Sequence, residues 1–356
     1  MRKPWFQNAR RVVVKLGTGV LTDPGKRLDP VQITQLVAQL AGLRSRGCEV
    51  LLVTSGAVGA GMGVMGYSRR PGAIHELQAC AAVGQSRLMA WYESLFRHYD
   101  LGVAQVLLTH DDLADHTRHL NARNTLITLL RRGILPIVNE NDAVSITELK
   151  FGDNDRLSAL VASLMSADLL VLLTTVAGLI EDFGHPGARV LPVVTQIDDT
   201  IVRMASGTNS VTAVGGMTTK IQAARIATRS GIPMVIASGR QFDVLSRILD
   251  GAEEGTLFLP SSPRLPARKR WIAFFERPRG TVFVDDGARR ALIENGRSLL
   301  GPGVTRAEGV FEAGDVVSIA GNDGREFARG LIRTASTDRT PAARSEWVHR
   351  NDLVLL

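Results

Sequence analysis

Short apolar runs alternate along the first two-thirds of the chain with segments whose apolar residues recur every three or four positions. Residues 12–16 (VVVKL) and 50–54 (VLLVT) are short, mainly apolar runs, typical of buried strands. The segment between them, residues 31–46, has helical spacing and is closed by Gly47. The same pattern predicts strands over 103–109, 134–138, 168–176 and 232–238, and helices over 74–98, 120–132, 154–166, 199–206, 218–229 and 242–249. Strands that are apolar on both faces and alternate with helices indicate a mainly parallel sheet covered on both sides, an α/β fold in three αβα layers.

The pattern changes near residue 260. Residues 259–270, LPSSPRLPARKR, are rich in Pro, Ser and Arg, a composition typical of a linker. Beyond them helical spacing fades, and short runs such as WIAFF, TVFV, VVSIA and WVHRNDLVLL alternate with Gly-rich turns. These runs predict strands of a small, mostly β domain. We place the α/β domain at 8–260, the linker at 261–269 and the second domain at 270–356.

Composition narrows the function classes. A length of 356 residues suits two domains, and 45% apolar with 22% charged residues is ordinary for a globular protein. The net charge of +7 is compatible with an anionic partner, such as nucleotide phosphates, RNA or acidic small molecules, and equally with a solvated basic surface. The sequence contains neither a signal-peptide core nor an apolar run of about 18 residues, so we expect a cytoplasmic protein without a membrane span. Cys48 and Cys80 are expected to be buried free thiols rather than a disulfide or nucleophiles.

The loops after the strands are rich in amides and carboxylates. Two of them carry Asn139, Glu140, Asn141, Asp142, Asp153, Asn154 and Asp155. Such groups are costly to bury unless they bind something, and a polar ligand with donor groups, such as an amino acid, would satisfy them. Asn, Asp and Gly also dominate solvated turns, so composition alone leaves both interpretations open.

Two lysines lie at strand ends or helix starts beside glycines. Lys15 ends the first strand, where a charge needs a partner, and Asp155 is a candidate. Lys220 stands in the first turn of a helix preceded by VGGM; it is either an exposed helix residue or the neighbour of a bound anion. The loop TSGAVGAG adds Ser55 and unobstructed backbone amides. Lysines, glycine-rich loops and carboxamides together favour phosphoryl transfer, which needs positioning and charge compensation.

Other motifs are weaker. The common phosphate-binding loop G-x-x-x-x-G-K-[ST] is absent from the sequence. GMGVMG, residues 61–66, matches the dinucleotide fingerprint by letters, but it follows its strand too late and lacks an acidic partner. A group of possible metal ligands, without the spacing of a zinc site, comprises His110, Asp111, Asp112, Asp115, His116 and His119. We predict no protein-held metal site.

Eight segments in register resemble the glutamate 5-kinases of the amino-acid kinase family, which carry a C-terminal PUA domain. They are VVVKLGTGVLT, VLLVTSGAVGAG, AAVGQSRL, NARNTL, PIVNENDAV, KFGDNDRLSALVA, GGMTTKIQAA and HRNDLVLL. The resemblance covers nearly the whole chain. It implies ATP-dependent phosphorylation of the L-glutamate γ-carboxylate, the first step of proline biosynthesis, with Mg²⁺ carried on the nucleotide. Another amino-acid kinase, acting on acetylglutamate, carbamate or aspartate, and an RNA-binding or regulatory protein with a degenerate kinase domain are the alternatives.

The resemblance also implies site residues. Glutamate would contact Ser55, Asp142 and Asn154, and ATP would contact Lys15, Thr174, Thr175, Val214, Gly215, Gly216, Met217, Thr218, Thr219 and Lys220. Lys15 and Lys220 would offset charge on the transferring group, oriented by Asp155, with the Gly17 and Gly56 amides assisting.

The sequence departs from the family's pattern in two places. Thr175 stands where the family usually has an acidic residue, and the PUA domain lacks the usual helical insert, so it is shortened and RNA binding is doubtful. Feedback inhibition by proline, a glutamyl-phosphate reductase partner and a homo-oligomer are further family expectations.

Overall fold

The computed structural model describes residues 2–23, 27–145, 154–206, 216–260, 264–337 and 345–356. The chain forms two compact units, Met1–Asp112 with Thr117–Arg264, and Leu113–His116 with Leu265–Leu356. None of the described helices combines the length and the apolar character that a bilayer crossing requires.

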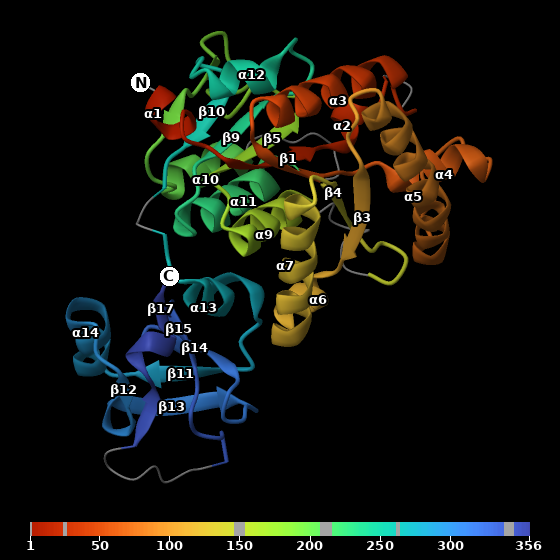
Figure 1. Cartoon of the computed structure of the whole chain (residues 1–356). Coiled ribbons are helices and arrows are strands. Elements are labelled where there is room, and N and C mark those ends of the chain that lie inside the picture. The colour runs from red at the N-terminus through yellow and green to blue at the C-terminus, as the bar shows by residue number, and fades with distance from the viewer. Residues whose placement is uncertain (1, 24–26, 146–153, 207–215, 261–263, 338–344) are drawn as a thin grey trace. The chain divides into compact units, whose positions relative to one another are not determined.

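The first unit is built on one large sheet (Figure 1). Its strands are β1 (Arg11–Leu16), β2 (Glu49–Val53), β3 (Val103–Leu108), β4 (Leu135–Glu140), β5 (Leu169–Thr174), β8 (Val193–Val194), β9 (Met234–Ser238) and β10 (Thr256–Phe258). They lie in the order β3-β4-β2-β1-β5-β9-β10-β8, and of these neighbours only β9 and β10 are antiparallel. A separate hairpin joins β6 (Ile180–Glu181) to β7 (Arg189–Val190). The predicted mainly parallel sheet is confirmed.

Helices cover both faces of this sheet. The helices that lie wholly or mainly in this unit are α1 (Lys3–Phe6), α2 (Thr18–Leu21), α3 (Pro30–Ser45), α4 (Ala57–Val64), α5 (Ile74–Arg97), α6 (His110–Ala114), α7 (His116–Arg131), α9 (Asn154–Met165), α10 (Asp199–Ser206), α11 (Met217–Arg229) and α12 (Val244–Leu249). Helices α3, α5 and α12 bury apolar residues against one face, in a cluster that includes Val12, Val14 and Leu16 of β1. Helix α9 packs against β1 and β5, and α11 packs against α9 and β9, which forms the other layer.

The second unit is mostly β. Its elements are α13 (Ala267–Arg270), the π-helix η1 (Trp271–Phe275), β11 (Gly280–Val284), α14 (Asp286–Asn295), β12 (Leu299–Leu300), η2 (Gly301–Gly303), β13 (Val304–Gly309), β14 (Val316–Ala320), β15 (Glu326–Leu331), β16 (Glu346–Val348), η3 (Arg350–Asp352) and β17 (Leu353–Leu355). Five of the strands form a sheet in the order β13-β11-β14-β15-β17, and β12 pairs with β16. Their inward side chains form an apolar core with Trp347, Phe311 and Leu292.

Two local predictions were wrong. WIAFF, expected to be a strand, is the π-helix η1, with Ile272, Ala273 and Phe275 buried. A five-residue apolar run has no period that separates a strand from a buried helix. Residues 57–64, expected to be a loop, form α4, so GMGVMG lies in the second half of a helix and in the turn after it, not between a strand and a helix.

The glycines of this region serve helix packing. A Cβ atom added to Gly61 of α4 would lie 1.8 Å from the Cys80 carbonyl oxygen of α5. A Cβ atom added to Gly84 of α5 would lie 1.8 Å from the Ala57 carbonyl oxygen. Only glycine at both positions allows the two backbones to approach this closely. Gly61 therefore packs α4 against α5, which agrees with the interpretation of GMGVMG as a dinucleotide fingerprint by letters alone.

Candidate active site

Strand alternation decides which layer Lys15 faces. Val12, Val14 and Leu16 point into the core under α3 and α12, so Val13 and Lys15 point to the opposite face. That face is covered by α9, which starts with Asn154 and Asp155, and by α11, which carries Lys220 in its first turn. Three distant segments therefore meet at the carboxyl edge of the parallel sheet, where α/β proteins bind ligands.

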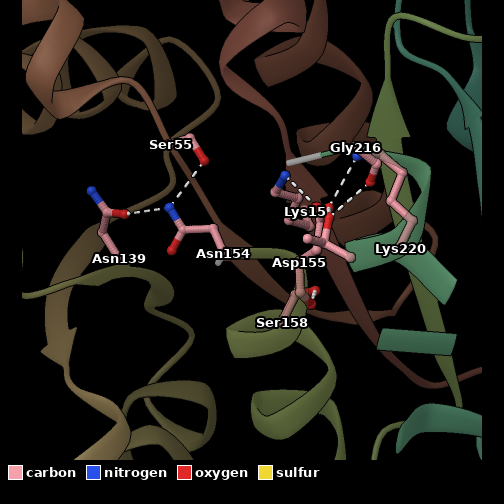
Figure 2. Close-up of polar contacts among 9 residues, drawn as sticks. Lys15, Ser55, Asn139, Asn154, Asp155, Ser158, Gly216 and Lys220 are labelled. Carbon is pink, nitrogen blue, oxygen red and sulfur yellow. Dashed lines mark hydrogen bonds and ion pairs between the residues drawn. The ribbon is translucent and has the colours of Figure 1, made fainter. Parts of the chain in front are cut away.

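Asp155 joins the two lysines (Figure 2). Lys15 Nζ lies 2.6 Å from Asp155 Oδ1, and Lys220 Nζ lies 3.0 Å from Asp155 Oδ2. The Thr219 hydroxyl also donates to Oδ2, at 2.7 Å. All three charged side chains are buried, with Asp155 only 1% exposed. Two ammonium groups share one carboxylate, so these three side chains together carry a formal charge of +1, which favours an anionic ligand nearby.

The charges set the pKa of Asp155. Burial alone raises it, but Lys15 and Lys220 outweigh burial and hold the pKa at about 2, below the ordinary 3.8. Because the folded pKa lies below the unfolded one, the carboxylate stabilises the fold fully above about pH 4, and this stability is lost as the pH falls towards about 2. We expect a loss of about 2 kcal/mol.

Urea unfolding of the wild type and of Asp155→Asn checks this pH dependence. The difference in unfolding free energy between them should shrink by about 2 kcal/mol between pH 5 and pH 2. A difference that stays constant over this range would contradict the depressed pKa.

A second polar group lies beside the lysines (Figure 2). Asn154 Nδ2 donates to Ser55 Oγ at 3.0 Å and to Asn139 Oδ1 at 3.2 Å. Asn139 is the penultimate residue of β4 and is 1% exposed. In turn its Nδ2 donates to Gln85 Oε1 of α5 at 2.7 Å. The start of α9 thus links a charged cluster, through Asp155, to an amide and hydroxyl cluster, through the adjacent Asn154.

The first turns of α4 and α11 could bind an anion through their backbone N–H groups. Gly56 is the N-cap of α4 and Gly216 that of α11, and neither helix has a side-chain cap there. Gly56 has φ +102°, a left-handed conformation that favours glycine. The unsatisfied N–H groups and positive dipole end of a helix attract phosphate and carboxylate groups.

The Gly17 amide does not join them, contrary to our prediction. Its N–H donates to the Leu173 carbonyl at 3.2 Å and so continues the pairing of β1 with β5. Gly17 directly follows β1, and the pairing with β5 continues to this residue and uses its N–H group. No feature of the sequence indicates that the pairing extends this far.

The remaining predicted residues are placed as follows. Asp142 lies half-buried in the turn after β4, Thr174 ends β5, and Thr175 is exposed beside Gly19. Met217 is buried and Thr218 exposed in the first turn of α11. Val214 and Gly215 lie outside the described residues, as does Asp153. Their roles stay predictions.

Asp112, one of the acidic and histidine residues after β3, has a structural role. Asp112 accepts hydrogen bonds from the Thr109 amide and hydroxyl at 2.9 and 2.8 Å, and Arg118 pairs with it. Within the part of the chain that the structure describes, no group of three or more His, Cys, Asp or Glu side chains is arranged to hold a metal ion. Cys48 and Cys80 are buried free thiols, and burial raises both pKa values.

Sequence reasoning missed three contributors. Asn139 appeared only as one of several polar loop residues, Thr219 only as a nucleotide contact, and Gln85 not at all. The AAVGQ segment reads as an ordinary helix face, so only the tertiary contact between α5 and β4 identifies Gln85. The role of Thr219 could have been inferred, because Thr219 and Lys220 are adjacent in the first turn of α11 and both reach Asp155.

Comparison with known proteins finds two families and long relatives for this chain. Residues 10–238 match the amino acid kinase family and residues 280–344 match the PUA domain. A protein named glutamate 5-kinase from Moorella thermoacetica is 47% identical, covering 99% of this chain and 97% of its own length. Another of that name, from Methylococcus capsulatus, is 46% identical, covering 98% and 97%.

A solved structure shares the fold. Carbamate kinase from Giardia lamblia bound to AMP-PNP is 18% identical, with a TM-score of 0.51, and the match covers 71% of this chain and 99% of that one. At this identity the likeness concerns the fold alone. Together with the long matches at nearly half identity, the sheet edge and its paired lysines identify the chain as a member of the glutamate 5-kinases, within the amino acid kinase family.

Proposed function

We propose that the chain transfers the γ-phosphoryl group of ATP to the γ-carboxylate of L-glutamate, giving glutamyl 5-phosphate and ADP, the first step of proline synthesis. The observation that carries the proposal is the buried cluster of Lys15, Asp155 and Lys220, whose ammonium nitrogens lie 2.6 and 3.0 Å from one carboxylate. The proteins named glutamate 5-kinase that match nearly the whole chain support the choice of substrate.

The chemistry requires no general base. An oxygen of the γ-carboxylate attacks the γ-phosphorus in line, the new P–O bond forms, and the bond between the phosphorus and the β,γ-bridging oxygen breaks to release ADP. A carboxylate is already deprotonated at neutral pH. What the site must supply is orientation and compensation of the charge on the transferring oxygens. Lys15 and Lys220 supply that charge, and Asp155 fixes both ammonium groups.

The two clusters divide the substrates. We assign glutamate to Ser55, Asp142 and Asn154. We assign ATP to Lys15, Thr174, Thr175 and residues 214–220. Asp155 and Asn154 are adjacent in α9, so one helix start positions both clusters, and glutamate and the γ-phosphate would meet over it.

Mg²⁺ would accompany the nucleotide. This ion is usually held by substrate phosphates with few protein ligands. Asp155 accepts from Lys15, Lys220 and Thr219, so three of its about four lone-pair positions are engaged, which suits an ion carried by the phosphates. Bound there, Mg²⁺ would withdraw negative charge from the phosphate oxygens. Its test is the dependence of ADP release on added Mg²⁺.

A substrate panel tests the proposed function. ADP release is measured with L-glutamate, L-aspartate, N-acetyl-L-glutamate and carbamate at equal concentrations. Release that depends on glutamate, and exceeds release with the others by about 100-fold or more, is the expected result. Equal rates with aspartate or N-acetylglutamate would assign the chain to another substrate.

Replacing Lys220 by Ala tests the phosphate side of the site. We expect kcat to fall by about 10³-fold, because one of the two compensating charges is lost, while glutamate still binds at the Ser55 and Asn154 cluster. Steady-state kinetics and calorimetric glutamate binding check this. The control is Arg225→Ala, which removes an exposed cation from the same helix and should leave kcat unchanged. Near wild-type turnover in Lys220→Ala would exclude Lys220 from the mechanism.

Three further expectations belong to this proposal. Proline is expected to compete with glutamate, because its carbon frame matches that of the cyclised product. A reductase is expected to consume the acyl phosphate, which is labile in water. Association into a homo-oligomer is the third, and sedimentation analysis measures it.

A further inference from the structure

We propose that Gln85 of α5 is a positioning residue for the amino-acid substrate: it sets which end of the Asn154 amide faces the ligand. The inference rests on the proposed function for the identity of that ligand. Gln85 is 8% exposed, and its Oε1 accepts from Asn139 Nδ2 at 2.7 Å. It touches neither Asn154 nor Ser55 through a hydrogen bond, so it acts through Asn139.

The direction of this relay is fixed by a backbone group. The Glu140 N–H donates to Asn139 Oδ1 at 2.9 Å. A backbone N–H can only donate, so the Asn139 oxygen must face it and the Asn139 NH₂ must face Gln85. Gln85 accordingly presents its oxygen. Any residue at position 85 without an acceptor leaves the Asn139 NH₂ buried and unpaired, which is unfavourable.

The second step passes from Asn139 to Asn154. The Asn139 oxygen faces Asn154 at 3.2 Å, so Asn154 must present its NH₂ there and to the Ser55 hydroxyl. Its own oxygen, Oδ1, then points away from both (Figure 2). This oxygen is buried and has no hydrogen-bond partner among the described residues. An unsatisfied acceptor of this kind favours a ligand that donates.

The chemistry of the ligand follows from the orientation. An α-ammonium group donates and cannot accept, so it complements Asn154 Oδ1. Were the Asn154 amide reversed, an NH₂ group would face the ammonium and repel it. Gln85 Nε2 likewise has no partner among the described residues, which leaves its Oε1 as the atom that carries the relay.

Two substitutions at position 85 test the relay. Gln85→Met keeps the length of the side chain and removes the acceptor, so we expect KM for glutamate to rise by about 10-fold while KM for ATP changes less than about 2-fold. Gln85→Glu keeps an acceptor for Asn139 and should hold KM for glutamate within about 3-fold of wild type. Gln78→Met, two turns earlier in α5 and outside the relay, is the matched control and should leave both constants unchanged.

Three outcomes would overturn the inference. The first is an unchanged KM for glutamate in Gln85→Met. The second is an equal rise of KM for glutamate and KM for ATP in that variant. The third is a rise of KM for glutamate in Gln85→Glu as large as that in Gln85→Met. A crystal structure of Gln85→Met provides a readout without turnover: Asn139 and Asn154 should lose their present contacts, and their retention would also overturn the inference. If the wild type released no ADP with glutamate, the proposed function would fail, while this crystal structure would still decide whether Gln85 orients the two amides.

Discussion

Replacing Asp155 by Asn is expected to lower kcat by about 10³-fold or more and to destabilise the first unit by about 3 kcal/mol. The substitution keeps the shape of the side chain but removes the charge that holds Lys15 and Lys220, and it can place an NH₂ group against an ammonium. Two buried ammonium groups would then lie close together without the carboxylate that joins them. They would repel each other and separate, and this change removes the preorganised charge that phosphoryl transfer needs.

Steady-state kinetics and urea unfolding at pH 7 measure both effects. Asp250→Asn is the matched control, because it removes the carboxylate of an exposed ion pair with Arg46 that has the same 2.6 Å separation. Exposed pairs contribute little, so this variant should change stability by less than about 1 kcal/mol and leave kcat unaltered. If Asp155→Asn kept wild-type turnover, the lysines would not depend on Asp155 and the catalytic account would be wrong.

Replacing Gly84 by Ala is expected to cost about 3 kcal/mol or more in stability. The new methyl group would lie 1.8 Å from the Ala57 carbonyl oxygen, a backbone atom that cannot move without shifting α4. Since α4 begins directly after Ser55 and Gly56, we also expect KM for glutamate to rise. Thermal unfolding and glutamate kinetics measure the two effects.

Gly63→Ala is the control for this effect. Gly63 lies in α4, and a Cβ atom there would meet nothing within 4 Å. Alanine is a better helix former than glycine, so this variant should be unchanged or more stable by up to about 1 kcal/mol. Equal behaviour of Gly63→Ala and Gly84→Ala would show that the contact between the helices does not depend on glycine.

The sequence predicts much of the site because a parallel sheet gathers its loops at one edge. Lys15 ends a strand and Asp155 begins a helix after a later strand, so their meeting follows from topology and from the need of a buried charge for a partner. The face that Lys15 occupies follows from the alternation of side chains along β1. These arguments use only local pattern and strand order.

The parts that could not be predicted depend on contacts between distant segments. Gly61 belongs to a loop-like, glycine-rich motif, and only the approach of α5 shows that it serves packing. The Gly17 amide is used by Leu173, from a strand far along the chain. Gln85 carries no local signal, since its role depends on Asn139. Short apolar runs such as residues 271–275 have no period, which is why a π-helix was mistaken for a strand.

The most direct test of the central claim is to trap the product. The wild type is incubated with ATP, Mg²⁺, L-glutamate and hydroxylamine, and the γ-hydroxamate of glutamate is quantified beside ADP. Hydroxylamine displaces phosphate from an acyl phosphate, so a kinase that phosphorylates the γ-carboxylate yields hydroxamate and ADP in equal amounts. We predict this equality in the wild type and loss of both products in Asp155→Asn. ADP without hydroxamate, or hydroxamate formation at the wild-type rate in Asp155→Asn, would contradict the account.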